Sequence, residues 1–155
     1  MTQDFISDGE ELYRNVRRDD EADEYFPDPT TGRVIITSQA FLDKPQNEPS
    51  VDRAKLKNFD PQKSLLKENN GVVSLIAGEV RQIGDVKSEE PKGSHIDHAV
   101  DVIHDPKPEN DAHSKIVVEP KYFSSDKKGK AFRLLRKALA RLATKRGWTL
   151  EPKGS

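Results

Sequence analysis

All four histidines of the chain lie between residues 95 and 113, and histidine is the side chain that most readily exchanges protons near neutral pH. Two of them, His104 and His113, flank a segment with two prolines, which predicts a hairpin loop. The neck of such a hairpin would bring both imidazoles together, with Asp105 and Asp111 close by. These groups suit a divalent metal ion, and they also suit acid–base catalysis.

The same residues have an ordinary structural interpretation, because histidine and aspartate are common at strand ends and Asp-Pro is common in turns. The sequence also lacks the glycine-rich fingerprints of nucleotide-binding proteins and the Gly-x-Ser-x-Gly elbow of serine hydrolases. A catalytic site at residues 104–113 is therefore the alternative hypothesis, not the leading one. His95 and His98 are expected to face solvent or to cap the entry to a strand.

Four short runs predict the strands that would position these residues. As a strand, residues 98–104 place His98, Val100, Val102 and His104 on one side and Ala99, Asp101 and Ile103 on the other. The other three runs are rich in β-branched residues and comprise residues 33–37, 72–77 and 113–118. The spacing of apolar residues from Val72 to Ile83 also fits a helical face, so a helix stays open as the alternative there.

The first 30 residues are strongly acidic, with ten Asp and Glu against three Arg, which gives a local charge of −7. Within them, Ser7-Asp8-Gly9-Glu10 matches a helix capping box. Leu12 and Val16 follow, four residues apart, as one apolar face. These features predict a short helix that ends near Arg17.

The middle of the chain contains two stretches with loop composition. Residues 43–50 are rich in proline and polar side chains and are expected to form a surface loop. Residues 84–94 are mostly charged, with two glycines, and are expected to form a flexible connection. Between these stretches, Asp60-Pro61 predicts the start of a helix and Asn69-Asn70-Gly71 its stop.

The clearest element is an amphipathic helix over residues 127–146, with caps offered by residues 124–126 and Gly147 as its C-terminal stop. Apolar residues recur on one face at helical spacing: Ala131, Phe132, Leu135, Ala138, Leu139 and Leu142. The opposite face carries Lys130, Arg133, Lys137 and Arg141, with Arg136 on its flank. The helix holds nine Lys and Arg and no acid, so its charge is +9 while the rest of the chain carries about −10.

Three roles compete for this basic face. It is a solvated surface partly balanced by the acidic N-terminal residues, or it neutralises the phosphates of a nucleic acid and gains affinity by counterion release. The third role is contact with a membrane surface or a groove on a partner. No base-stacking aromatic residues interleave with the cations, which favours the first role. Docking of the acidic N-terminus onto the helix would mask it.

Length and composition set outer bounds on these interpretations. A chain of 155 residues suits one domain, and an apolar share of 33% predicts a modest core with long polar connections. The chain has no cysteine, which excludes disulfides, thiolate metal ligands and cysteine catalysis within it. Its start has no signal-peptide pattern, and no apolar run approaches the roughly 20 residues that span a bilayer. We therefore expect a soluble cytoplasmic protein.

Together these patterns predict a small α+β fold, in which an antiparallel or mixed sheet of about four strands carries the long C-terminal helix on one face. We expect an acidic segment over residues 1–30, one domain over residues 31–150 and a tail over residues 151–155. The expected function is that of a non-enzymatic binding or accessory protein without a cofactor, whose basic helix contacts a nucleic acid or an acidic protein partner. The alternative is a metal-dependent phosphodiesterase or nuclease, in which a divalent ion at residues 104–113 polarises a phosphoryl oxygen.

Overall fold

A computed structural model describes residues 5–19, 21–43, 47–89, 93–121 and 129–153 of the chain. Its centre is a six-stranded sheet with the order β10-β5-β1-β4-β9-β8, in which every neighbouring pair is antiparallel. The strands are β1 (Glu11–Val16), β4 (Ser50–Arg53), β5 (Gly71–Ile76), β8 (Ala99–His104), β9 (His113–Glu119) and β10 (Trp148–Leu150). The α+β class is confirmed, but the sheet has six strands, not about four.

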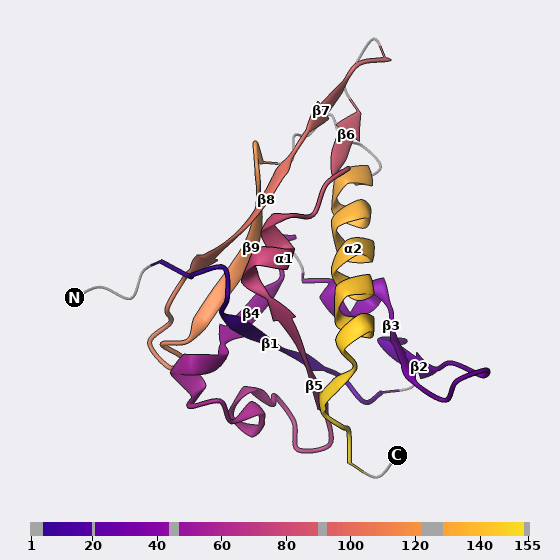
Figure 1. Ribbon diagram of the computed structural model, residues 1–155, viewed down its shortest axis with the longest axis vertical. Coiled ribbons are helices and arrows are strands. Elements are labelled where there is room, and N and C mark those ends of the chain that lie inside the picture. The colour runs from indigo at the N-terminus through magenta and orange to yellow at the C-terminus, as the bar shows by residue number, and fades with distance from the viewer. Residues whose placement is uncertain (1–4, 20, 44–46, 90–92, 122–128, 154–155) are drawn as a thin grey trace.

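The long helix α2 (Lys130–Arg146) packs on one face of this sheet, as predicted (Figure 1). Its apolar residues Leu135 and Leu139 share one buried cluster with Leu12 of β1 and Leu75 of β5. Gly147 ends the helix with a φ of 77°, a conformation that favours glycine, and its amide donates to the Ala143 carbonyl at 2.9 Å. The predicted caps at residues 124–126 lie outside the described residues.

Side-chain alternation gives the main sheet two distinct faces. In β9, Ser114, Ile116 and Val118 are buried toward α2, and in β8 Val100 and Val102 continue the same face. The residues between them point to the opposite face, where a small second cluster contains Tyr13 and Val72. The residues of the β8–β9 hairpin are therefore divided between the two faces of the sheet.

The predicted N-terminal helix is wrong, because residues 11–16 form β1, a central strand between β5 and β4. The capping-box contact does form, since the Ser7 amide donates to the Glu10 carboxylate at 2.9 Å, but it closes only a turn. A spacing of four fits a strand as well as a helix, and Leu12 and Val16 lie on the same buried face of β1. Hydrogen-bonded pairing with β4 and β5 then makes this segment a strand.

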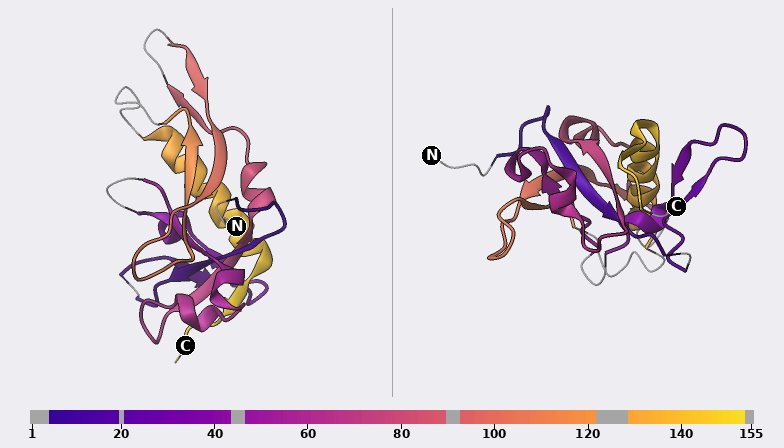
Figure 2. Two further views of the ribbon diagram at one scale, coloured as in Figure 1. Left: turned by 90° about the vertical axis from the view of Figure 1, so that its left-hand side faces the viewer. Right: turned by 90° about the horizontal axis from the view of Figure 1, so that it is seen from below.

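Two separate ribbons flank α2 and the main sheet. The predicted strand at residues 33–37 is confirmed as β3 (Val34–Ile36), but it pairs with β2 (Tyr25–Pro27) and not with the main sheet. Figures 1 and 2 show α2 between the main sheet and this ribbon, and the Ile36 amide donates to the Thr144 hydroxyl at 2.8 Å. The second ribbon joins β6 (Lys87–Glu89) to β7 (His95–Asp97), so part of the expected flexible connection is a strand.

Short helices occupy the connections. They are η1 (Ser38–Phe41), η2 (Ala54–Lys57), η3 (Pro61–Ser64) and α1 (Ala77–Arg81). Asp60 caps η3 as predicted, by accepting a hydrogen bond from the Gln62 amide at 3.1 Å, but this helix has only one turn. The apolar run from Val72 is β5 followed directly by α1, which is why both spacings fit it.

The division of the chain at residues 30 and 150 stays a prediction, although β1, from the first of those ranges, pairs with strands of the second. Within the described ranges, no helix combines the length and apolarity needed to cross a membrane.

Candidate functional site

The exposed surface of α2 carries a row of cations that is inclined to the helix axis. Its members are four residues apart: Arg133, Lys137, Arg141 and Lys145, called here the basic row. All four side chains belong to exposed residues, whereas the apolar side of the helix is buried. A step of four residues advances about 6 Å along a helix, so the row extends over about 18 Å. Arg133, Lys137 and Arg141 belong to the set of cations predicted from the sequence, whereas Lys145 does not.

Two other predicted cations differ from the row. Lys130 is exposed but pairs with Glu89 at 3.2 Å, which ties the start of α2 to β6. Arg136 is only 9% exposed, and its guanidinium carbon lies 4.4 Å from the centre of the Phe132 ring. Arg136 therefore faces the interior of the fold and does not extend the exposed basic surface.

Five arginines of this fold pair with carboxylates, and three members of the basic row differ from them. In the part of the chain that the structure describes, no Asp or Glu oxygen lies within 4.0 Å of Lys137, Arg141 or Lys145. The acids of the N-terminal segment pair elsewhere: Asp8 with Arg81, Glu10 with Arg53 and Glu24 with Arg17. Glu11 reaches α2, but it pairs with Arg146, outside the row.

A shallow groove of about 570 Å³ runs beside the basic row. Its lining includes Lys137, Arg141 and Lys145 of α2, Ile35 and Ile36 of β3, and the acidic residue Asp28. The groove thus places apolar surface next to positive charge.

The predicted histidine cluster does not assemble as expected. His104 pairs with Ser114 across the β8–β9 hairpin, so its side chain lies on the α2 face of the sheet. His113 precedes Ser114 and therefore points to the opposite face. The two imidazoles lie on opposite faces of the sheet and are not placed to share a metal ion. The prediction failed because it considered the length of the loop but not the register of the strand pairing.

His113 instead contacts two residues on its own face. Its Nδ1 lies 2.8 Å from the backbone oxygen of Asp105 and 3.4 Å from the carboxylate Oδ2 of that residue. Its Nε2 lies 3.1 Å from the hydroxyl oxygen of Ser50, at the start of β4. The structure therefore brings together Ser50, His113 and Asp105.

The remaining predicted site residues stand apart from that group. His104 is half-buried, and among the described residues its Nδ1 has no hydrogen-bond partner. Asp111 is exposed in the hairpin loop. In the described ranges no three His, Asp or Glu side chains come close enough to hold a metal ion.

His98 was expected to face solvent or to cap the entry to a strand, and it does not face solvent, because it is only 5% exposed. Its Nε2 contacts the Ser88 hydroxyl at 2.7 Å and its Nδ1 contacts the carbonyl oxygen of Pro120. This histidine joins β6 to the end of β9 and has a structural role.

Ser50 and His113 line a cleft of about 730 Å³ between β1, β4 and the hairpin loop. A hydrogen-bonded group closes one side, because Asp52 accepts from Ser64 at 2.6 Å and from Asn110 at 2.8 Å. Sequence analysis missed Ser50 because it assigned residues 43–50 to a loop. The only signal was the alternation Ser50-Val51-Asp52, which is too short to predict a strand.

The backbone of Ser50 is held from both sides by one ion pair. Arg14 makes two hydrogen bonds to the Asp43 carboxylate, at 2.7 and 2.9 Å, and a third to the Ser50 carbonyl at 2.9 Å. Asp43 in turn accepts from the Ser50 amide at 2.7 Å. Burial acts to raise the pKa of Asp43, but its bonds to Arg14 outweigh burial and hold that pKa below its usual value. Asp43 therefore remains an acceptor for Ser50 near neutral pH.

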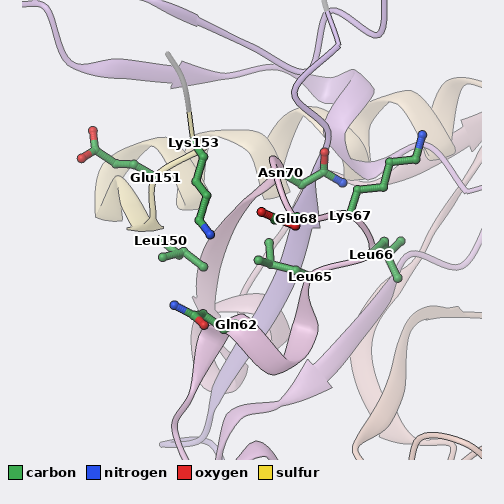
Figure 3. A pocket seen from close by; sticks show the side chains of 9 residues that line it. All are labelled: Gln62, Leu65, Leu66, Lys67, Glu68, Asn70, Leu150, Glu151 and Lys153. Carbon is green, nitrogen blue, oxygen red and sulfur yellow. The ribbon is translucent and has the colours of Figure 1, made fainter.

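A smaller hollow of about 260 Å³ lies between residues 62–70 and residues 150–153 (Figure 3). Leu65 and Leu150 line it together with charged side chains of both signs, among them Glu68 and Lys153. No ion pair joins these charged residues to one another in the described structure. The hollow offers no group of residues arranged for chemistry.

No protein-family model, curated protein or solved structure matches this chain, so its sites are interpreted from their own geometry.

Proposed function

We propose that this chain binds nucleic acid through the basic row of α2. The supporting observation is that Lys137, Arg141 and Lys145 are exposed and have no carboxylate within 4.0 Å among the described residues. Cations that are already paired would exchange one partner for another, whereas these three lose only water and counterions. Binding through them therefore gains the full free energy of counterion release.

The spacing of the row also suits a phosphate backbone. Phosphates of one DNA strand advance about 3.4 Å per nucleotide, so a row of about 18 Å covers roughly five nucleotides. Such contacts fix the orientation of a nucleic acid but do not select its sequence. The proposed binding is therefore general and sensitive to salt, needs no cofactor, and belongs in the cytoplasm, where nucleic acid is accessible.

An acidic protein partner is the second candidate, and the groove beside the row favours it. Ile35 would contact apolar side chains of a peptide while Lys137 and Arg141 pair with its carboxylates. Contacts to phosphates make no use of that apolar surface. The two candidates therefore predict different effects of substituting Ile35.

The test is fluorescence anisotropy of a short mixed-sequence nucleic acid, measured over a series of salt concentrations. The variant Lys137→Glu/Arg141→Glu/Lys145→Glu reverses the row, and we expect it to lower the affinity by about tenfold or more. The matched control Lys57→Glu/Lys63→Glu/Lys67→Glu makes the same charge change on η2 and the residues around η3. We expect the control to have a much smaller effect.

Equal losses in the two triple variants would show that only net charge matters, and would contradict a site on α2. Absence of binding by the unaltered chain at low salt would exclude nucleic acid as the partner. An acidic peptide whose binding is weakened by Ile35→Ser and by reversal of the row would then support the second candidate.

A further inference from the structure

The hydrogen bonds of His113 fix which ring nitrogen carries the proton. Its Nδ1 lies 2.8 Å from the backbone oxygen of Asp105, and a carbonyl oxygen can only accept. The neutral ring therefore holds its proton on Nδ1 and presents a lone pair at Nε2. That lone pair faces the Ser50 hydroxyl at 3.1 Å, so Ser50 donates to His113. This is the arrangement that a general base needs in order to take a proton from a serine.

The Asp105 carboxylate completes the arrangement on the other side of the ring. Its Oδ2 lies 3.4 Å from Nδ1 of His113 and 3.2 Å from Nζ of Lys107. The hydrogen bond and charge of Lys107 hold the pKa of Asp105 below its usual value, so this group is ionised near neutral pH. An ionised carboxylate beside the ring stabilises the imidazolium that forms when His113 accepts a proton.

Ser50 is both accessible and rigidly placed. It lines the cleft of about 730 Å³ together with His113, and its amide and carbonyl are held by Asp43 and Arg14. Asn15 of β1 also lines this cleft. The Oδ1 of Asn15 accepts from the Leu66 amide at 3.0 Å and from the Asn70 side-chain amide at 3.3 Å.

The charges of the cleft indicate the class of substrate. Its lining includes four carboxylates, of Glu24, Asp43, Glu48 and Asp52, and two guanidinium groups, of Arg14 and Arg17. Both guanidinium groups are bonded to carboxylates, of Asp43 and Glu24. A phosphate or another anion would be repelled, whereas an uncharged ester would not. Leu42 and Leu66 supply apolar surface for its acyl group.

We propose that this cleft hydrolyses uncharged carboxylic esters, with Ser50 as nucleophile and His113 as general base. His113 takes the hydroxyl proton while Oγ of Ser50 forms a bond to the carbonyl carbon. The carbon–oxygen bond to the alcohol then breaks, and His113 returns the proton to the departing alkoxide. Water, deprotonated by His113, attacks the acyl-serine in the same way, releasing the acid and restoring Ser50. Asp105 is a positioning residue that acts through His113.

The first experiment uses a fluorophosphonate ester, in which serine displaces fluoride to form a stable phosphorus–oxygen bond. After reaction with the full unaltered chain, peptide mass spectrometry locates the adduct. The chain contains no cysteine, so thiols make no background. We expect one adduct per chain on Ser50, and its loss in His113→Gln. An adduct at other residues only, or none, would overturn the proposal without the need for any variant at Ser50.

The second experiment measures hydrolysis of p-nitrophenyl butyrate. We expect Ser50→Ala and His113→Gln each to lower the rate by about 100-fold or more, with unchanged circular dichroism. The control His95→Gln removes an exposed imidazole outside the cleft, because surface histidines also hydrolyse activated esters slowly. Equal rates in Ser50→Ala and the unaltered chain, or a loss confined to His95→Gln, would mean that the Ser50–His113 bond only joins β4 to β9. Neither result depends on nucleic-acid binding by α2.

Discussion

The sheet and the exposed face of α2 use the same kinds of charged residue in opposite ways. In the sheet, Arg14 and Arg53 each bond to a carboxylate through two nitrogens and lie largely away from water. On α2, Lys137 and Arg141 are exposed and have no carboxylate within 4.0 Å among the described residues. A buried charge must be paired, because an isolated one is costly to remove from water, whereas an exposed charge needs no partner.

Buried, paired charges therefore stabilise the fold, whereas exposed charges are available to bind a partner. Removing a buried arginine leaves its carboxylate uncompensated, so the fold loses stability. Removing an exposed lysine leaves nothing uncompensated, so its effect appears only when a partner is present. Substitutions of charged residues in the sheet should therefore lower the stability of the fold, whereas substitutions on the exposed face of α2 should lower the affinity for a partner.

The largest effect is expected for Arg53→Ala. Arg53 is fully buried, and its Nε and its terminal NH₂ group donate to the two oxygens of Glu10, both at 2.8 Å. The substitution leaves Glu10 buried without its partner, and we expect a loss of about 3–5 kcal/mol in the free energy of unfolding. Urea denaturation near pH 7 measures it.

Lys55→Ala is the matched control, since Lys55 lies 3.6 Å from the same Glu10 carboxylate but is 40% exposed. Its loss should stay below about 1 kcal/mol. Similar losses for the two variants would mean that burial does not decide the role of a charge in this fold.

An intermediate effect is expected from acid. Burial acts to raise the pKa values of Glu10 and Asp43, but bonds to Arg53 and Arg14 outweigh it and leave both pKa values lowered. The folded state thus binds fewer protons than the unfolded state as the pH falls past their ordinary values of 4.5 and 3.8. The stability they contribute is fully present above those values and is lost as the pH falls through the folded pKa values.

Urea denaturation at a series of pH values from 7 to 3 tests this expectation. The variant Asp43→Asn should be less stable near neutral pH and should lose less further stability in acid, because it lacks one of the two groups. If its curve of stability against pH ran parallel to that of the unaltered chain, Asp43 would not be a source of the acid sensitivity.

Local patterns were sufficient for the parts of the fold that depend on near neighbours. The helix over residues 130–146, its glycine stop and the β8–β9 hairpin were predictable because helical periodicity, strand alternation and turn residues act over a few positions. β1 was not, since Leu12 and Val16 satisfy both periods. Only pairing with β4 and β5, some 40 and 60 residues further along the chain, makes that segment a strand.

The residues of the cleft also depend on contacts between distant parts of the chain, which local sequence patterns do not predict. Both His113 and Asp105 were predicted as site residues, but their partner Ser50 lies 63 positions from His113, on a strand of four residues. The separation of His104 from His113 depends on register, because a shift of one residue would reverse the face of every side chain. Local sequence patterns do not determine that register. Which histidine meets which partner therefore follows from tertiary pairing.

The smallest effect on stability is expected from Arg141→Gln. Arg141 is exposed in the middle of the basic row, and no described carboxylate lies within 4.0 Å of it, so the free energy of unfolding should change by less than about 0.5 kcal/mol. Arg14→Gln provides the contrast, because it removes four hydrogen bonds from the buried side of the fold and should cost about 2 kcal/mol or more. In nucleic-acid binding, Arg141→Gln should have the larger effect of the two. It should reduce the slope of log affinity against log salt by about 1, because one phosphate contact is lost, while Arg14→Gln leaves the slope unchanged. If Arg14→Gln altered the slope as much as Arg141→Gln did, paired and unpaired cations would be equivalent toward a polyanion, and the distinction between the two regions would not hold.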